Sequence, residues 1–507
     1  MPARPPRPSA LAATRRGVLA AGAAPLLAQC AGAAVVETGT LTLGLGLEPP
    51  TLDPTLGAAA ATDEVVYANV FEGLTRMRET GAIEPALARA WETSRDGRTY
   101  TFRLHPGVRF HDGAPCEAAD VVFSLDRARA EGSTNAQTAL FAPIDAVEAL
   151  DPLTVRVRLS RPAGDFLSVL AWGDAAIVSR RSAATNATDP IGTGPFRFDH
   201  WARGAMIALK RNETYWGPPA QLDAARFVFV PDAAAAYAAL LAGDVDGFPD
   251  FPAPELLQLV QRDGRFRIAI GASQGETILA MNNARAPFTD LRVRRALSHA
   301  IDRTAVIRAA TFGYGQPIGA HMAPTDPAYV DLTGAYPYDP ARARALLAEA
   351  GFPNGFAARL TLPPTGYARR GGEVIAAQLA AIGVAVRIDN MEWAQWLDQT
   401  FANADYDLTV VSHTEPNDIG IYARDDYYFR YRSDAFNAAM RTAEAATAPQ
   451  DRIAALQEAQ RILSRDAVNV FLFQFPKLGV WRKDVRGVWR DAPIPANDLT
   501  AAARAPA

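Results

Sequence analysis

Residues 281–303 read MNNARAPFTDLRVRRALSHAIDR, and most of this stretch has the pattern of one amphipathic helix. Its apolar residues recur at i, i+3, i+4, i+7 and i+8, the spacing of a single buried helical face: Val293, Ala296, Leu297, Ala300 and Ile301. Asp290 stands at the position of an N-cap. The arginines off this face are expected to form a solvated outer surface: Arg292, Arg294 and Arg295. The pattern predicts a scaffold helix packed on a core.

The sequence of this stretch also resembles one protein family. Asparagines after an apolar strand precede P-F-x-D-x-R-V-R-x-A-L-x-x-A-I-D-R, which is similar to the extracytoplasmic solute-binding proteins of the peptide, nickel and opine class that serve ABC importers. The resemblance extends to three further phrases: Glu48–Pro54 (EPPTLDP), Tyr100–Gly113 (YTFRLHPGVRFHDG) and Ile191–Phe196 (IGTGPF). It implies the periplasmic-binding-protein fold, with two α/β lobes joined by a two-crossing hinge and an extra subdomain in the first lobe.

The resemblance also implies an order of domains along the chain. We expect lobe I at 34–270, with an inserted subdomain at about 68–190, lobe II at 271–475, and a C-terminal return to lobe I at 476–507. The segment near Ile270 and the apolar strand Val468–Phe475 would be the two hinge crossings. From the residues themselves, a helix is predicted at about 63–74, and alternating helices and parallel strands are predicted from Tyr338 onward.

The first 33 residues have the features of an export signal. Thr14-Arg15-Arg16 precedes a short Ala/Gly/Leu run, which suggests the twin-arginine route, and Ala31-Gly32-Ala33 supplies a cleavage site. Lipidation of Cys30, which would anchor the protein to a membrane, is the minority alternative. Whether Cys30 is removed or lipidated, Cys116 has no partner in the mature chain, so a disulfide framework is excluded and Cys116 is expected to be a small buried residue.

Composition and motifs argue against several other functions. Lys+Arg of 51 against Asp+Glu of 55 leaves a net charge of -4, so no nucleic-acid partner is expected. Gly271–Gly275 is a literal G-x-S-x-G, and a hydrolase built around Ser273 is the enzyme alternative. A strand rather than a helix is predicted after that serine, so we expect a binding protein and no catalytic residue. Gly192-Thr193-Gly194 lacks the sequence of a phosphate cradle and is predicted to be a tight backbone passage.

The cleft of an α/β fold lies at strand ends, so the segment after the predicted strand Tyr406–Val411 is where a ligand is expected. The candidate ligand-binding residues are Glu48, Trp393, Trp396, Ser412, His413, Thr414, Glu415, Asn417, Asp418, Arg424 and Tyr431. One of the two tryptophans is expected in the core and the other at the cleft edge. In peptide-binding members of the resembled class, an acidic residue three positions before an E-P or D-P pair holds the ligand's ammonium group. Here that position, counted from Glu415-Pro416, is the uncharged Ser412.

A cofactor or a metal bound directly by the protein is not expected from this sequence, although a chelated metal could enter with an organic ligand. The six histidines are scattered without i, i+4 pairing: His105, His111, His200, His299, His321 and His413. The resulting hypothesis is a monomeric periplasmic receptor that closes on a small solute, such as a peptide or opine, and delivers it to an ABC permease. A chemoreceptor ligand or a folding helper on the same fold is the remaining alternative.

Overall fold

The computed structural model describes residues 39–57, 59–414 and 418–505, and all contacts below lie within the unit Thr38–Ala507. Its architecture is mixed α/β, as the helix and strand patterns predict. The expected export signal, Cys30, Glu415 and Asn417 lie outside the described residues.

One large mixed sheet organises the described chain, in the order β15-β14-β16-β12-β17-β11-β1-β10-β9-β8, with β13 beside β17. Its strands are β1 (Thr40–Leu45), β8 (Phe196–Ala202), β9 (Met206–Arg211), β10 (Ala224–Phe229), β11 (Gly247–Phe248), β12 (Phe266–Met281), β13 (Gln316–Pro317), β14 (Phe356–Leu362), β15 (Val384–Asn390), β16 (Leu408–His413) and β17 (Asn469–Arg482). β14 pairs in parallel with both β15 and β16, which confirms the parallel strands predicted after Tyr338.

Smaller sheets complete the strand inventory. An antiparallel sheet of order β4-β5-β7-β6 comprises β4 (Ala88–Thr93), β5 (Thr99–Leu104), β6 (Ile144–Asp151) and β7 (Thr154–Leu159). Two short pairs are β2 (Thr75–Met77) with β3 (Ile83–Pro85), and β18 (Val485–Arg486) with β19 (Ala503–Arg504). Tyr100, Phe102 and Leu104 alternate along β5 and are buried, as strand periodicity requires.

The helices pack on these sheets through apolar faces. They are α1 (Ala60–Val66), α2 (Ala118–Arg129), α3 (Thr138–Phe141), α4 (Phe166–Val169), α5 (Ala233–Ala242), α6 (Leu257–Arg262), α7 (Leu291–Ala300), α8 (Arg303–Thr311), α9 (Pro340–Glu349), α10 (Gly366–Ala380), α11 (Trp393–Trp396), α12 (Asp434–Ala445) and α13 (Pro449–Arg465). Short 3-10 or π-helical turns are η1 (Gly173–Ala175), η2 (Pro254–Leu256), η3 (Thr333–Ala335), η4 (Leu397–Ala402) and η5 (Asp418–Ala423). Helix α1 ends at Val66, so the helix predicted to extend to Leu74 is much shorter than expected.

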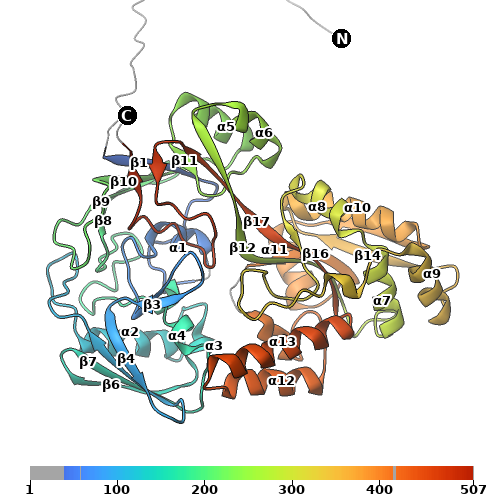
Figure 1. Cartoon of the computed structure of the whole chain (residues 1–507), viewed down its shortest axis with the longest axis horizontal. Helices are drawn as coiled ribbons and strands as arrows, with labels where there is room; N and C mark the ends of the chain where they lie inside the picture. The colour runs from blue at the N-terminus through green and yellow to red at the C-terminus, as the bar shows by residue number, and fades with distance from the viewer. Residues whose placement is uncertain (1–38, 58, 415–417, 506–507) are drawn as a thin grey trace, which may run out of the picture. The chain divides into compact units, whose positions relative to one another are not determined.

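The strands β12 and β17 connect the two ends of the large sheet. Figure 1 shows them running side by side from β11 to β16, and they pair antiparallel along nearly their whole length. The pairing is interrupted between Ala272 and Glu276, where the register shifts. On one side of this break β17 also pairs with β11, and on the other side β12 also pairs with β16. The pair is therefore shared by both parts of the sheet.

Helix α7 carries the apolar face that its sequence predicts. Val293, Ala296, Leu297 and Ala300 are fully buried, and the Asp290 carboxylate accepts a hydrogen bond from the backbone N–H of Arg292, which confirms the N-cap. The expectation for Arg294 is wrong, because this side chain is buried. Its guanidinium donates to the carbonyl oxygens of Phe288 (2.8 Å) and Asp466 (2.9 Å), and Asp466 is the C-cap of α13. The end of α13 packs where solvent was expected, and a guanidinium satisfies its carbonyls.

Replacing Arg294 with methionine is expected to lower the free energy of unfolding by about 2 kcal/mol, because two buried carbonyls lose a charged donor. Arg308 is a matched control on the neighbouring helix α8: it is exposed, and Arg308→Met is expected to stay within about 0.5 kcal/mol of the wild type. Urea unfolding of the three proteins measures the difference. Equal losses in both variants would contradict a specific role for Arg294.

Candidate functional site

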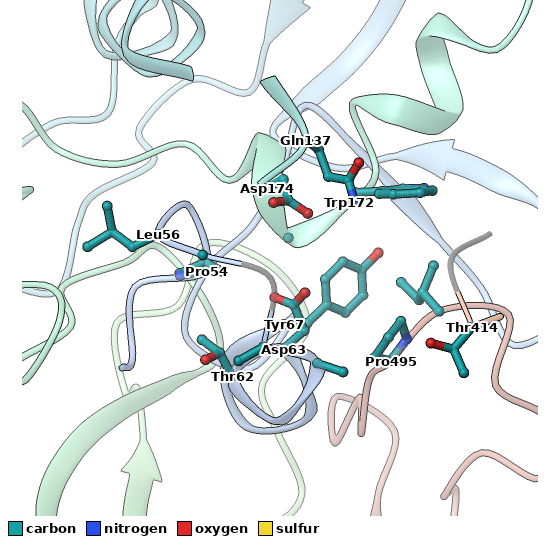
Figure 2. Close-up of a pocket in the computed structure, with 15 residues that line it drawn as sticks. Pro54, Leu56, Thr62, Asp63, Tyr67, Gln137, Trp172, Asp174, Thr414 and Pro495 are labelled. Carbon is teal, nitrogen blue, oxygen red and sulfur yellow. The ribbon is translucent and has the colours of Figure 1, made fainter. Parts of the chain in front are cut away.

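A pocket lies among five separated parts of the chain (Figure 2). Its lining is Pro54, Leu56, Gly57, Ala59, Ala60, Thr62, Asp63, Tyr67, Gln137, Trp172, Gly173, Asp174, Thr414, Ile494 and Pro495. Helix α1 and the loop before it form one wall, η1 another, and Thr414 follows strand β16. The cavity volume is about 80 Å³.

The loop that leads into the pocket is held by its own polar residues. The buried Asp53 carboxylate accepts from the backbone N–H of Thr55 (2.9 Å) and forms an ion pair with Arg127 (3.1 Å) on α2. The Thr62 hydroxyl of α1 donates to the carbonyl of Thr51 (3.0 Å). The prolines of this segment exclude helix and central strand, so these side chains set the path of a loop. As a result, Pro54 and Leu56 are fixed at the pocket wall.

Two carboxylates face this pocket, those of Asp63 and Asp174 (Figure 2). Oδ1 of Asp63 is buried and accepts no hydrogen bond from a described residue. Burial, and then the charges of Asp174 and Glu64, raise the pKa of Asp63 well above its usual range. Burial also raises the pKa of Asp174 to about 7. The pocket, as the structure shows it, therefore destabilises the ionised forms of Asp63 and Asp174.

Gly173 allows Asp63 and η1 to approach closely. A Cβ at position 173 would lie 2.0 Å from Oδ1 of Asp63, so any larger residue would displace that carboxylate.

The neighbouring Glu64 belongs to a different cluster: burial, and then the charge of Asp250, raise its pKa to about 7, while Lys477 of β17 opposes that rise. Helix α1 thus supplies acids both to the pocket and to the surroundings of the crossing strand β17.

Of the described residues predicted to bind ligand, Thr414 is the one that lines this pocket. The Glu48 carboxylate instead accepts from Trp201 Nε1–H (2.9 Å) and from the backbone N–H of Gly204. Trp396 is buried and donates to the Thr409 hydroxyl, whereas Trp393 is 43% exposed. This division agrees with one tryptophan in the core, although neither lines the pocket.

The remaining predicted residues also have other surroundings. The Ser412 backbone N–H donates to the Tyr367 hydroxyl, and Ser412 Oγ is buried without a partner among the described residues. Arg424 is exposed and lies over the ring of Tyr427. The Tyr431 hydroxyl donates to the Asp466 carboxylate (2.6 Å). These contacts are internal to the fold.

His321, His413 and Asp418 form a buried network that the sequence did not indicate. Asp418 Oδ1 lies 2.7 Å from His321 Nε2, and Oδ2 lies 3.4 Å from His413 Nδ1. The other ring nitrogens meet the hydroxyls of Tyr422 (3.2 Å) and Tyr428 (3.0 Å). Among the described residues, these three could hold a metal ion, since their ligand atoms lie within 4.8 Å of one another. Three of the four ring nitrogens form hydrogen bonds and His413 Nδ1 contacts the Asp418 carboxylate, so the network serves as a structural element.

The serine of the G-x-S-x-G motif has a structural environment. Ser273 lies within the strand β12, and its hydroxyl donates to the carbonyl of Phe475 (2.7 Å) and accepts from the backbone N–H of Gly275. A nucleophile elbow requires a helix directly after the serine, and here the strand continues. Burial of Cys116 raises the pKa of its thiol, which agrees with the expected small buried residue.

Asp63, Asp174 and Trp172 line the pocket but were not predicted from the sequence as binding residues. The first is more than a hundred positions from the other two, and nothing in the chain relates them before folding. The one available signal was the position of Asp63 shortly after the EPPTLDP loop, which was expected to leave a strand end. Among the described residues no helix combines the length and the apolar character needed to cross a membrane.

Comparisons with known proteins agree with the resemblance seen in the motifs. Residues 82–435 match the family model described as bacterial extracellular solute-binding proteins, family 5 middle. The chain is 32% identical over 397 residues to the dipeptide-binding protein of Escherichia coli K12, covering 72% of this chain and 74% of that protein.

Two solved structures share the fold. One is the ABC transporter-associated periplasmic binding protein DppA of Helicobacter pylori in complex with the peptide STSA (TM-score 0.80, 26% identity, 92% of this chain and 98% of that chain). The other is the binding protein AgaA of A. tumefaciens R10 in complex with agropinic acid (TM-score 0.77, 26% identity, 92% and 99%). The match to the family model spans well over half of the sequence, and the chain belongs to family 5 of the bacterial extracellular solute-binding proteins.

Proposed function

We propose that this protein is the extracytoplasmic receptor of an ABC importer: it captures a small organic solute and delivers it to a membrane permease. The observation that carries the proposal is the pocket at Asp63 and Asp174, to which Thr414 also contributes from beyond strand β16. Binding sites of this kind are concave and few per protein. The similar proteins named above bind a dipeptide, the peptide STSA and agropinic acid, which supports a peptide-like or opine-like solute.

Capture would occur by closure of two lobes. We assign lobe I to 34–270, with the subdomain at about 68–190, lobe II to 271–475 and the return segment to 476–507. The pairing of β12 with β17 breaks between Ala272 and Glu276, close to both boundaries, which supports a hinge there. A ligand shifts the open and closed populations only by its differential affinity for the two forms, so solute contacts from both lobes are required.

Export also belongs to the proposal. Residues 1–33 would direct the chain out of the cytoplasm by the twin-arginine route, and the mature protein would act in the periplasm as a monomer without a nucleic-acid partner. Cleavage after Ala33 removes Cys30, whereas lipidation would retain it, so the intact mass of the mature protein distinguishes the two.

Native mass spectrometry of mature protein from its own periplasm, followed by thermal unfolding with peptides and opines, tests the receptor function. A solute at about 100 times its Kd is expected to add about 2.7 kcal/mol of stability, which corresponds to a rise of several degrees in Tm. Absence of both a co-purifying solute and a thermal shift across the panel would contradict the proposal.

Ser273→Ala separates this function from the hydrolase alternative. The variant loses the hydroxyl bridge to Phe475, but its solute affinity is expected to remain within about threefold of the wild type, because Ser273 does not line the pocket. Loss of a measurable hydrolytic turnover in Ser273→Ala would instead favour the enzyme.

A further inference from the structure

The described lining of the pocket contains acidic side chains but no basic ones. Asp63 and Asp174 are its ionisable acids, and none of its described lining residues is lysine, arginine or histidine. Neither carboxylate forms an ion pair with a described residue, although arginines elsewhere in the chain pair extensively. A carboxylate removed from water is stabilised by an opposite charge nearby, and no side chain of the pocket supplies one.

Two buried polar atoms at this pocket are also left without partners among the described residues. Oδ1 of Asp63 is buried and accepts no hydrogen bond from the described chain, and Nε1 of Trp172 is buried and donates none. Native proteins seldom leave buried polar groups unsatisfied, and such groups mark places where another molecule completes the hydrogen bonding. Both atoms belong to residues that line the same pocket.

Aromatic rings stand beside the carboxylates. Figure 2 shows the ring of Tyr67 next to Asp63 and the indole of Trp172 beside Asp174. The Tyr67 hydroxyl accepts from the backbone N–H of Met77 (3.0 Å), which fixes the ring in place. Faces of Tyr and Trp attract cations, and the attraction grows when the cation is removed from water. Two acids with two aromatic walls form a pattern suited to a cationic group.

Size restricts which cationic group enters. The cavity volume of about 80 Å³ is roughly half that of a cavity of about 150 Å³ that holds benzene. A cavity of this size holds a group of a few heavy atoms, such as an ammonium group with its attached carbon. Thr414 and Pro495 lie together on one side of Tyr67, where the rest of a solute would continue (Figure 2).

We propose that Asp63 and Asp174, flanked by Trp172 and Tyr67, bind the ammonium group of the transported solute. This inference rests on the proposed receptor function and adds the substrate class: amines that carry a free ammonium end. The negative charges would come from Asp63 of α1 and Asp174 of η1. Thr414, which follows β16, would contribute a neutral side chain. Ser412, which is uncharged and lies outside the pocket lining, has no part in it.

The test uses matched solutes and matched variants of the full mature protein. The probes are alanyl-alanine, glutathione and putrescine, each beside the derivative in which every amino group is N-acetylated, with binding measured by calorimetry. At least one amine is expected to bind, and its N-acetylated derivative is expected to bind at least about tenfold more weakly. Asp63→Asn and Asp174→Asn are each expected to weaken that amine about 10- to 100-fold, the loss of one charge-assisted contact. Asp244→Asn makes the same charge change at an exposed acid outside the pocket and is expected to bind like the wild type.

The outcomes separate the two proposals. Equal binding of an amine and its N-acetylated derivative by the wild type overturns the ammonium site, and this comparison needs no variant. Wild-type affinity in both folded Asn variants overturns it as well. If only neutral or acetylated solutes bind, the receptor function stands and the ammonium site falls. If no probe binds and no solute co-purifies, both proposals fall.

Discussion

Alanine in place of Gly192 is expected to lower the free energy of unfolding by about 4 kcal/mol or more, which is exceptional for a single methyl group. A Cβ at this position would lie 1.9 Å from the carbonyl oxygen of Val70 and 2.7 Å from its carbonyl carbon. That oxygen already accepts a hydrogen bond from the backbone N–H of Gly194 (3.0 Å). The backbone at residue 192 and the carbonyl of Val70 cannot move aside as a side chain would, because hydrogen bonds fix both segments of backbone.

Gly264→Ala is the matched control for this substitution. A Cβ there meets no atom within 4 Å, and its backbone lies outside the left-handed region. The control is therefore expected to be neutral or slightly stabilising, by up to about 1 kcal/mol, because alanine restricts the unfolded chain. Urea and thermal unfolding of both variants provide the comparison. A stable Gly192→Ala protein would mean that the approach of residue 192 to Val70 is not essential to the fold.

The fold was largely predictable where local patterns coincide with burial. Two glycines around Thr193 indicated a tight backbone passage, and the contacts of Gly192 and Gly194 with the backbone of Asn69 and Val70 confirm it. The apolar spacing of α7 and the parallel strands β14–β16 followed from periodicity in the same way. The prediction that Arg294 is exposed was wrong. The periodicity of apolar residues describes the faces of α7 alone, and it contains no information on the end of α13 that packs against Arg294.

The pocket was less predictable, for a related reason. Thr414 was accessible to prediction because it follows an apolar strand, and strand ends line clefts. No local sequence pattern indicates that Asp63 and Asp174 lie in one pocket. They are brought together only because η1 packs closely on α1 at Gly173. The proximity of the two histidines was not predictable either: His321 and His413 are far apart in sequence, and only the fold places both against Asp418.

Asp418→Asn is expected to lower the free energy of unfolding by about 3 to 5 kcal/mol at pH 7, because the substitution removes the charge from a buried network. Asp418 contacts both His321 and His413, and the Tyr422 hydroxyl beyond His321 accepts from Asn469 of β17 (3.0 Å). The network thus connects η5, β16 and β17 inside one core. Asn retains the size of Asp, so a cavity does not contribute to the loss.

Asp425→Asn is the control for this change in charge. Asp425 is 59% exposed and lies 3.5 Å from Arg432, so its ion pair is worth at most about 1 kcal/mol. Urea unfolding at pH 7 is expected to separate the two variants clearly. Similar midpoints for both would mean that the buried network contributes no more than a surface ion pair.

The dependence on pH tests the electrostatic origin of the Asp418 effect. Burial alone would raise the pKa of this carboxyl, but the charge and hydrogen bond of His321, followed by those of His413, outweigh burial and hold the pKa well below its usual range. A carboxyl with a depressed folded pKa stabilises the protein fully above its unfolded pKa of about 3.9, and this stabilisation declines as the pH falls below that value. The gap between wild type and Asp418→Asn is therefore expected to be about 1 kcal/mol narrower at pH 3 than at pH 7. A gap that stays constant or widens in acid would instead assign the loss to altered packing around residue 418.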